Sequence, residues 1–378
     1  MDPKQIEIWT GNQAIAEAVI VSKPEIVAAY PITPSTPIIE FLSDAYSSGR
    51  IPGEFIAVES EHAAMAGCVG ASAAGSRTFT ATASQGLLYM MEMVYFAGMG
   101  RLPMTMTVVN RALYGGWSIW VDHQDLYSMR DTGWIQVAAK NNQEAHDLIP
   151  QMFKLSENHD VYLPAAVNID GFTLSHVAGQ VEPLQSRMID DFLPTFNPMF
   201  KLDPEDPVSY GALTLPDDYR ALREDLVDSM ERAKSLFKKI TTEFTDLTGR
   251  DWGGHVEIYG PEDAEVGIIA MGTLGEEAEE TVDYLNEKGG HFGATRIRTF
   301  RPFPTDEIIE AATRYDKLIV IDRGYSFGST SPLVTEIRNT LYQVRSNVKV
   351  YSLIIGVGGA EVSYKDIAKA VTKTLEEN

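Results

Sequence analysis

Short apolar runs alternate with amphipathic stretches along the first part of the chain. Continuous apolar runs, each followed by a segment with apolar residues three or four positions apart, are typical of parallel strands buried under helices. The pattern therefore predicts an α/β domain with a parallel sheet flanked by helices over residues 1–182. Its expected strands are Ile26–Tyr30, Glu54–Val58, Arg77–Ala83, Met104–Val109 and Val161–Ile169.

Helices are expected between these strands. Thr10-Gly11-Asn12-Gln13 fits a capping box that opens a helix running through Val21. A helix of small residues is expected over Glu59–Ala74, and Ser84-Gln85-Gly86 is expected to turn into a Met-rich helix that ends near Met99.

The pattern changes over residues 183–259. Repeated prolines predict an extended crossover, and one long helix is expected from Asp217 to Leu247, ended by Gly249. This range is interpreted as a linker that carries its own helix.

Residues 260–378 return to the α/β pattern and predict a second domain. The expected strands are Val266–Met271, Gly293–Thr299, Lys317–Asp322 and Val348–Ile355. The expected helices are Gly275–Glu287, Thr305–Thr313, Pro332–Leu341 and a last one from Tyr364.

Composition excludes several classes of protein. The net charge of −22 argues against a nucleic-acid partner and would repel an acidic protein at long range. No apolar run approaches the roughly 18 residues of a membrane span, and the start MDPKQIEIWT does not resemble a signal peptide. A cytoplasmic location is the resulting expectation.

The chain contains one cysteine, Cys68. A single thiol excludes a disulfide framework and a thiolate-bound iron–sulfur cluster or zinc-finger site within this chain. Because Cys68 lies in the small-residue run AAMAGCVGASAAG, it is interpreted as a packed core thiol.

The run Tyr30-Pro31-Ile32-Thr33-Pro34-Ser35-Thr36-Pro37 is a rigid connection between a strand and a helix. Its prolines restrict φ repeatedly, and Pro37 suits a first helical turn with Thr36 or Ser35 as N-cap. A stiff loop with hydroxyl groups at the carboxyl end of a buried strand is where α/β proteins bind ligands. A well-built turn without a ligand is the alternative.

Glu61 is the foremost candidate for chemistry. It lies in Val58-Glu59-Ser60-Glu61-His62, at the expected start of a helix, where the dipole stabilises a carboxylate by roughly 0.3–1 kcal/mol. The small residues that follow would let a flat ligand approach. Helix capping alone is the competing interpretation.

Arg111 follows a predicted strand and enters a glycine-containing aromatic loop, Tyr114–Trp120. An arginine in this position can bind a carboxylate in a bidentate manner, and a surface salt bridge is the alternative. The next polar cluster, Asp122-His123-Gln124-Asp125, is not interpreted as a metal site because neighbouring side chains do not converge easily. Gly356-Val357-Gly358-Gly359 lacks a full dinucleotide fingerprint and is expected to be a turn.

Together these segments resemble the α subunit of the 2-oxoacid:ferredoxin oxidoreductases, thiamine-diphosphate enzymes typified by pyruvate:ferredoxin oxidoreductase. The resembling pieces are AAYPITPSTPIIE, VESEHAAMAGCVGASAAGSRTFTATASQGL, the NRAL segment, DHQD, RDTGWIQ, DGFTLSH, AMG, RIRTFRPFP and IDRGYSFG. The resemblance implies an α/β fold with a thiamine-enzyme pyrimidine-binding domain and a transketolase C-terminal-like domain.

The resemblance also implies roles for individual residues. Glu61 would hydrogen-bond N1′ of the aminopyrimidine and so promote removal of the thiazolium C2 proton, from a buried site. The cofactor's surroundings would include Pro31 and Ser84-Gln85-Gly86.

The substrate's oxo and carboxylate oxygens would be bound by Thr33 and Arg111, with Asn110 beside them. Asp122, Tyr114 and Trp117 are expected around these groups rather than on the substrate itself.

The resemblance further implies partner chains. A thiamine enzyme needs a GDG…NN motif for diphosphate and Mg²⁺, and this motif is missing from the chain. A β subunit is therefore expected to supply diphosphate binding, Mg²⁺ and a [4Fe-4S] cluster, alongside γ and ferredoxin-like δ subunits. Coenzyme A is the expected acyl acceptor.

The substrate is expected to be pyruvate or a larger 2-oxo acid. Tyr114-Gly115-Gly116-Trp117-Ser118 replaces the Ser-Ala-Pro-type stretch of pyruvate enzymes, which suggests an aromatic substrate such as phenylglyoxylate. An oxalate-type variant is disfavoured because Thr33 stands where a second cation would serve a dianion. A non-catalytic scaffold subunit and a nucleotide-dependent dehydrogenase are the rival functions.

Overall fold

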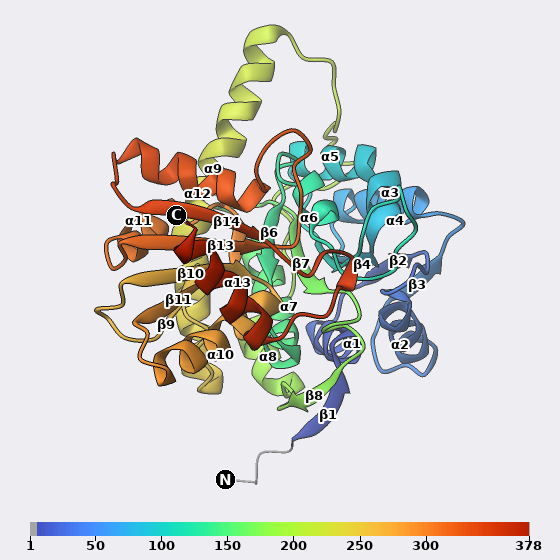
Figure 1. Ribbon diagram of the computed structural model, residues 1–378. Helices are drawn as coiled ribbons and strands as arrows, with labels where there is room; N and C mark the ends of the chain where they lie inside the picture. Colours follow the sequence, from blue (N-terminus) through green and yellow to red (C-terminus); the bar gives the residue numbers. More distant parts are fainter. Residues whose placement is uncertain (1–5, 378) are drawn as a thin grey trace.

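The structure is a computed structural model that describes residues 6–377. Residues 1–5, part of the start inspected for a leader, and residue 378 lie outside the described residues. The described chain forms two α/β domains side by side, each built around its own sheet (Figure 1). In the described part of the chain, no helix is long and apolar enough to cross a membrane.

The first sheet has seven strands in the order β12-β6-β7-β5-β4-β2-β3. Six of them are parallel, and only β12 runs antiparallel to its neighbour β6. Their bounds are β2 (Ile26–Ala29), β3 (Glu54–Ala57), β4 (Thr78–Thr82), β5 (Thr105–Asn110), β6 (Ile135–Ala138), β7 (Ala165–Asp170) and β12 (Thr299–Arg301).

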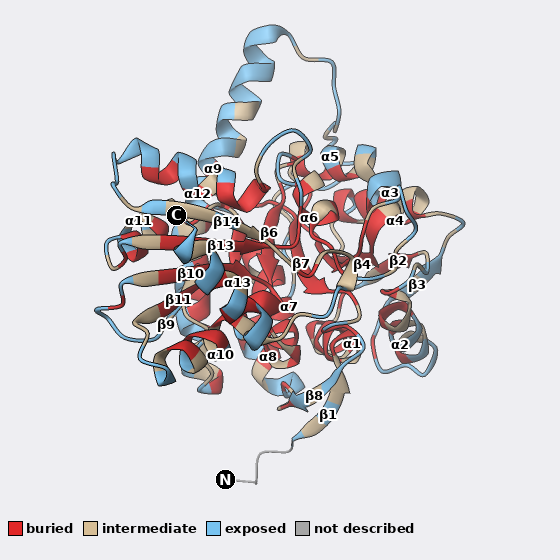
Figure 2. Cartoon of the chain, viewed as in Figure 1, coloured by how far each residue is buried: buried red, intermediate tan, exposed pale blue. Residues whose placement is uncertain are grey.

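Helices cover both faces of this sheet, so successive strand residues enter different cores. Ala165, Val167 and Ile169 of β7 pack into one core and Ala166 into the other. The first core contains α1 (Gly11–Ser22), α2 (Thr36–Ser47) and α7 (Asn142–Glu157), and the second contains α3 (Glu61–Ala73), α4 (Ser84–Tyr89) and α5 (Met91–Met99). The four central strands, β4 to β7, are buried along their whole length as a result (Figure 2).

A small antiparallel sheet is followed by two helices, which lie between the two domains in the sequence. The sheet pairs β1 (Glu7–Thr10) with β8 (Ala178–Val181), and α8 (Ser186–Phe192) follows it. The long helix α9 (Pro216–Thr248) packs its second half on the first core, while its first half projects from the molecule at the top of Figure 1.

The second sheet has five strands in the order β14-β13-β10-β11-β9, of which only β9 is antiparallel. Its strands are β9 (Val256–Tyr259), β10 (Val266–Met271), β11 (Phe292–Ile297), β13 (Lys317–Asp322) and β14 (Lys349–Ile354). The associated helices are α6 (Gln124–Ser128), α10 (Thr273–Glu287), α11 (Thr305–Ala312), α12 (Pro332–Gln343), the short η1 (Val357–Gly359) and α13 (Tyr364–Glu376).

Several local predictions are confirmed. The Thr10 side chain caps α1 by accepting the N–H of Gln13 at 3.2 Å, and Gly249 ends α9 in the left-handed conformation. Cys68 is fully buried, and burial raises the pKa of its thiol to about 12, as expected for a core residue. The Met-rich helix differs from its prediction because it breaks at Met90 into α4 and α5.

Two elements lie away from the places that the sequence suggested. The strand β9 falls within the range interpreted as a linker but pairs with β11 in the second sheet. The strand β12 belongs by sequence to the second domain but extends the first sheet through Thr299↔Val137 and Arg301↔Gln136. Cross-domain strand pairing depends on contacts between distant segments, which local periodicity does not encode.

A buried ion cluster also joins the two domains. Glu144 of α7 accepts hydrogen bonds from Arg296 at 2.8 and 3.1 Å and from Arg298 at 2.6 Å. Burial alone would raise the pKa of Glu144, but the two guanidinium groups outweigh it and hold the pKa below its ordinary value. The stability from this shift is complete above the unfolded-state pKa and is lost as the pH falls through the folded-state pKa.

We expect Glu144→Gln to lower the free energy of unfolding by about 3–5 kcal/mol, because the buried Arg298 loses its counter-charge and Arg296 keeps only Glu257. Urea denaturation at neutral pH measures the change. Glu280→Gln, at an exposed position of α10, is the matched control and should change stability by less than about 0.5 kcal/mol. Equal effects of the two substitutions would contradict a stabilising role for the cluster.

Candidate functional site

The predicted site residues lie at the carboxyl ends of the parallel strands in the first sheet. The loop after β2 carries Pro31 and Thr33, and the turn after β4 carries Ser84-Gln85-Gly86. From β2 the chain proceeds to β3 on one side of it and then to β4 on the other. This reversal of strand order makes a topological switch point, where open α/β sheets bind ligands.

Glu61 begins α3 and lies against the turn after β4. Ser60 caps the helix by accepting the N–H of Ala63 at 3.2 Å, so the Glu61 carboxylate does not serve as the cap. The Glu61 side chain is 8% exposed. A Cβ atom at Gly86 would lie 2.7 Å from Glu61 Oε1, so a side chain at position 86 would displace the carboxylate.

Asp125 connects the turn after β4 to the end of β5. Its carboxylate accepts the backbone N–H groups of Ser84 at 3.0 Å and Arg111 at 2.9 Å. It also accepts the side-chain amide of Asn110 at 2.9 Å and the N–H of Leu126 at 2.8 Å. The buried carboxylate therefore holds three predicted site residues in one arrangement.

Burial raises the pKa of Asp125 to about 6, while the N–H donors oppose this rise. The sequence drew attention to the Asp122–Asp125 cluster but indicated Asp122 as the neighbour of the site. The structure instead brings Asp125 to Asn110 and Arg111, whereas Asp122 accepts the N–H of Gln124 at 2.6 Å. Sequence spacing could not choose between two aspartates on either side of a helix start.

Arg111 bridges two loops. Its guanidinium donates to the carbonyl oxygen of Thr33 at 2.8 Å and to that of Ser118 at 3.3 Å. Burial lowers the pKa of Arg111, and the Asp125 carboxylate acts in the opposite direction. Within residues 6–377 these two bonds use two of the five N–H donors of the guanidinium, so donors remain for a ligand carboxylate.

The proline loop, residues 30–37, exposes some of its side chains to solvent and buries others. Thr33 and Pro31 are exposed, while Pro34 and Ser35 are buried. The Pro34 carbonyl accepts the side-chain amide of the buried Asn12 at 2.9 Å, and Ser35 donates its hydroxyl to the Ile32 carbonyl at 2.8 Å. These bonds hold the loop from beneath and leave Thr33 free to meet a ligand.

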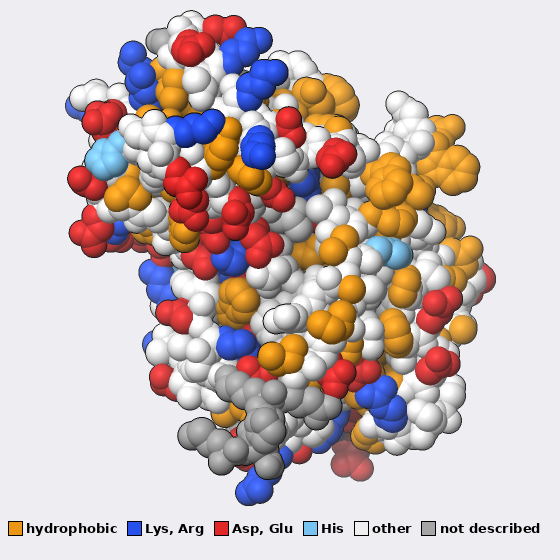
Figure 3. All heavy atoms as spheres, turned by 60° about the horizontal axis from the view of Figure 1, so that its bottom comes forward, with side chains coloured by type: hydrophobic (Ala, Val, Ile, Leu, Met, Phe, Trp, Pro, Cys, Tyr) orange, Lys and Arg blue, Asp and Glu red, His pale blue; other side chains and the backbone are white. Residues whose placement is uncertain are grey.

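The aromatic residues of the next loop do not enclose a pocket within this chain. Tyr114 is 77% and Trp117 is 79% exposed. Gly115 and Gly116 adopt φ values of 131° and 109°, which other residues rarely reach, and a Cβ atom at either would meet nothing within 4 Å. In Figure 3 hydrophobic side chains gather on the right of the molecule, over the first domain, and acidic ones on the left.

His123 lies in a buried ion network that joins the first domain to the second. Its Nε2 atom lies 2.8 Å from Oδ1 of Asp170, and its Nδ1 atom lies 3.9 Å from Oδ1 of Asp322. The Arg323 guanidinium donates to Oδ2 of Asp170 at 2.7 Å. Burial alone would lower the pKa of His123, but the two carboxylates outweigh it and raise the pKa. Asp170 also accepts the N–H of Thr273 at 3.1 Å, at the start of α10. This network was not predicted from the sequence.

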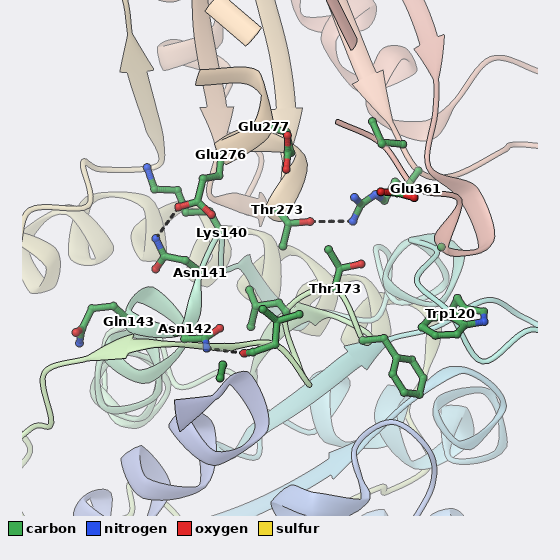
Figure 4. A pocket seen from close by; sticks show the side chains of 18 of the residues that line it. Trp120, Lys140, Asn141, Asn142, Gln143, Thr173, Thr273, Glu276, Glu277 and Glu361 are labelled. Atoms are coloured by element: carbon green, nitrogen blue, oxygen red, sulfur yellow. Dashed lines mark hydrogen bonds between the residues drawn. The ribbon is translucent and has the colours of Figure 1, made fainter. Parts of the chain in front are cut away.

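A separate cavity of about 630 Å³ lies between the domains (Figure 4). Its walls come from the start of α7, the segment after β7, and the carboxyl ends of β10 and β13, which contribute Thr273 and Arg323. Lys140 faces this cavity but is bound to Glu257 at 2.9 Å and Glu279 at 2.8 Å. The lining includes none of the site residues predicted from the sequence.

The surroundings of Glu61 fit a flat heterocycle that offers an N–H group to a carboxylate. Gly86 leaves the space beside Glu61 Oε1 without a side chain, and Ala63, Ala66 and Gly67 on α3 are only partly covered. Among residues 6–377, no group of three or more His, Cys, Asp or Glu side chains is arranged to hold a metal ion.

Two family models match the chain. Residues 17–242 match the family described as pyruvate flavodoxin/ferredoxin oxidoreductase, thiamine diP-bdg. Residues 264–367 match pyruvate:ferredoxin oxidoreductase core domain II. The two matches cover both α/β domains.

Curated relatives match over nearly the whole chain. Pyruvate synthase subunit PorA of Methanothermobacter thermautotrophicus is 41% identical over 98% of this chain and 95% of its own. Ketoisovalerate oxidoreductase subunit VorA of Pyrococcus abyssi is 40% identical over 98% of this chain and 93% of its own. These names do not support the aromatic 2-oxo acid phenylglyoxylate that the loop composition suggested.

Solved structures share the fold. The 2-oxoglutarate:ferredoxin oxidoreductase from Magnetococcus marinus, with 2-oxoglutarate, coenzyme A and succinyl-CoA bound, covers 99% of this chain. This chain covers 66% of that one, with a TM-score of 0.73 and 20% identity. A split-gene transketolase in an inactive β4 tetramer covers 97% of this chain with a TM-score of 0.58 and 13% identity.

The predicted fold class is therefore confirmed: a thiamine-enzyme pyrimidine-binding-like domain is followed by a transketolase C-terminal-like domain. The extent of the family matches and the identity to curated relatives lead to one assignment. The chain belongs to the 2-oxoacid:ferredoxin oxidoreductase family, as an α subunit.

Proposed function

We propose that this α subunit takes part in the oxidative decarboxylation of pyruvate or ketoisovalerate with coenzyme A. In this reaction the C1–C2 bond breaks, carbon dioxide leaves, and the acyl group is transferred to the coenzyme A sulfur. Two electrons pass to iron–sulfur clusters and then to ferredoxin. The observation that carries the proposal is the buried Glu61 carboxylate against Gly86, close to the hydrogen-bonded group around Arg111.

Glu61 would hold the aminopyrimidine of thiamine diphosphate, with Pro31, Ser84, Gln85 and Gly86 around it. The bound cofactor would accept the electron pair that is left when the bond between the carboxylate and the oxo carbon breaks. Glu61 has a specific task in this arrangement, which is to hold a proton at N1′. Its position at a helix N-terminus and its low exposure favour a carboxylate that binds one partner and excludes water.

Arg111 would bind the carboxylate of the 2-oxo acid, and the Thr33 hydroxyl would bind its oxo oxygen. Two carbonyl oxygens orient the Arg111 guanidinium, and Asp125 positions its backbone. This support reduces the entropy lost when the substrate binds. Asn110, held by Asp125 and placed 3.3 Å from the Asn168 side-chain oxygen, would complete the wall behind the substrate.

Partner subunits would complete the site. The only cysteine of the chain is buried in the first domain, so cluster ligands must come from other chains. A β subunit would provide the diphosphate and Mg²⁺ site and a [4Fe-4S] cluster, with γ and ferredoxin-like δ subunits in the same complex. The exposed Tyr114 and Trp117 beside the site support a surface that another chain covers.

Glu61→Gln should reduce the turnover rate of the assembled complex by a factor of about 10²–10⁴, because a neutral amide cannot hold the N1′ proton as a carboxylate does. Steady-state rates with pyruvate and coenzyme A measure the loss. Glu59→Gln, two residues earlier and exposed, is the matched control and should keep its activity.

Size-exclusion chromatography should give the same assembled complex for both variants. Full turnover by the Glu61→Gln complex would instead support the scaffold interpretation and end the catalytic one.

Arg111→Lys should raise the KM for the 2-oxo acid by roughly 10–100-fold, because an ammonium group cannot form two parallel bonds to a carboxylate. Initial-rate measurements over a range of substrate concentrations give the change. Arg130→Lys, at an exposed position, serves as the control. An unchanged KM in the Arg111 variant would remove this residue from the substrate site.

The purified complex should turn over pyruvate or ketoisovalerate with a higher kcat/KM than 2-oxoglutarate or phenylglyoxylate. Pyruvate and ketoisovalerate carry one carboxylate, which Arg111 can bind, whereas the second carboxylate of 2-oxoglutarate would require a further cation. Kinetic constants for the four acids decide between them. A preference for 2-oxoglutarate or phenylglyoxylate would overturn the proposed substrate class.

A further inference from the structure

The first half of α9 extends beyond the body of the protein. The part of the helix that begins at Pro216 projects at the top of Figure 1, and Figure 2 shows it almost entirely exposed. A solitary projecting helix gains little stability from its own hydrogen bonds, because helices in water depend on packing of an apolar face.

One apolar stripe continues along the whole helix. Its inner part, which includes Ala233, Phe237, Ile240 and Phe244, is buried in the core of the first domain. Leu215, Tyr219 and Leu222 continue the same spacing of three or four residues outward. Leu215 is 70% and Leu222 is 55% exposed, so the stripe continues past the core that covers it.

The stripe borders a groove of about 860 Å³ at the base of the projecting helix. Phe96 and Met99 from α5, and Phe200 and Tyr210 from the linker, form an apolar part of its lining. Leu213, just before the helix, is 100% exposed. The groove and the outer stripe form one surface, which we call the α9 surface.

The charge around the α9 surface restricts its partner. Between Leu202 and Glu231 the chain carries nine Asp and Glu residues but only two Arg and no Lys. One of these cations, Arg223, lies 4.5 Å over the Tyr219 ring and donates to its hydroxyl, so it is engaged locally. At the base of the groove, Arg101 and Arg232 form ion pairs with Asp225. The excess of negative charge therefore lies on residues 203–231, around the exposed apolar side chains.

We propose that the α9 surface binds a different subunit of the same oxidoreductase, through an apolar segment flanked by Lys and Arg side chains. This inference rests on the proposed function for the existence of that complex. A second copy of this chain would bring two segments with the same excess of negative charge together, which is electrostatically unfavourable. A partner segment with net negative charge is disfavoured for the same reason.

The test uses the complex obtained by co-expressing this chain with its partner subunits, purified through a tag on a partner. In the test variant, Leu213, Leu215 and Leu222 are each replaced by Gln, which removes the apolar side chains and preserves charge and helix propensity. We expect the affinity for the complex to fall by roughly 100-fold, because buried apolar anchors dominate binding energy. Native mass spectrometry across a dilution series measures it.

Ala221→Gln is the matched control, because it introduces the same side chain on the opposite, exposed face of α9. This variant should assemble like the natural chain. Circular dichroism should show unchanged folding for both variants. Normal assembly of the three-leucine variant would overturn the proposal.

A second experiment identifies the occupant. A photoreactive benzoylphenylalanine at position 215 in the assembled complex should crosslink to a Lys- and Arg-containing segment of another subunit. Asp217→Asn with Asp218→Asn should weaken assembly at low salt and have little effect at high salt, where the charges are screened. Crosslinking to a second copy or to an acidic segment of another chain would overturn the proposal.

The two proposals fail in different ways. A natural complex that assembles through the α9 surface but oxidises no 2-oxo acid would remove the proposed reaction and keep the surface. If the natural complex turns over pyruvate and the three-leucine variant assembles normally, the α9 surface is not an interface and the proposed reaction still stands.

Discussion

The site depends on one buried carboxylate, that of Asp125. It accepts N–H groups from Ser84, Asn110, Arg111 and Leu126, which belong to three separate segments of the chain. A buried charge is costly unless hydrogen bonds satisfy it, so these segments cannot separate without leaving the carboxylate unpaired. The position of the Arg111 guanidinium and of the Gly86 turn against Glu61 both follow from this arrangement.

The same short segment also connects the site to the second domain. His123, two residues before Asp125, lies between the carboxylates of Asp170 and Asp322, and its backbone N–H donates to the Arg323 carbonyl at 3.2 Å. The second domain therefore supports the site without contributing a predicted site residue to it. Together with β12 and the Glu144 cluster, this network makes the two domains mechanically dependent on each other.

The surfaces left open by this chain are consistent with its place in a larger assembly. Thr33, Tyr114 and Trp117 are exposed at the surface of this chain. The cavity between the domains lies elsewhere and is lined by none of these residues. If Thr33 binds the substrate as proposed, a second chain would be needed to exclude water from it.

Much could be predicted from the sequence because the relevant signals are local. Apolar runs with turn residues at their ends identified five strands of the first sheet and four of the second but missed β6, β9 and β12. The proline loop and Glu61 could be placed at strand ends. The choice of Asp125 over Asp122, the transfer of β12 to the first sheet and the solvent exposure of Trp117 could not be predicted in this way. Secondary structure and strand-end chemistry were determined by the sequence alone, since they depend on neighbours within a few residues. Which carboxylate accepts which donor was decided only by the tertiary structure, because the partners come from segments far apart in the sequence. His123 and Asp170, for example, are 47 residues apart, and the contacts between the domains join residues that are farther apart still.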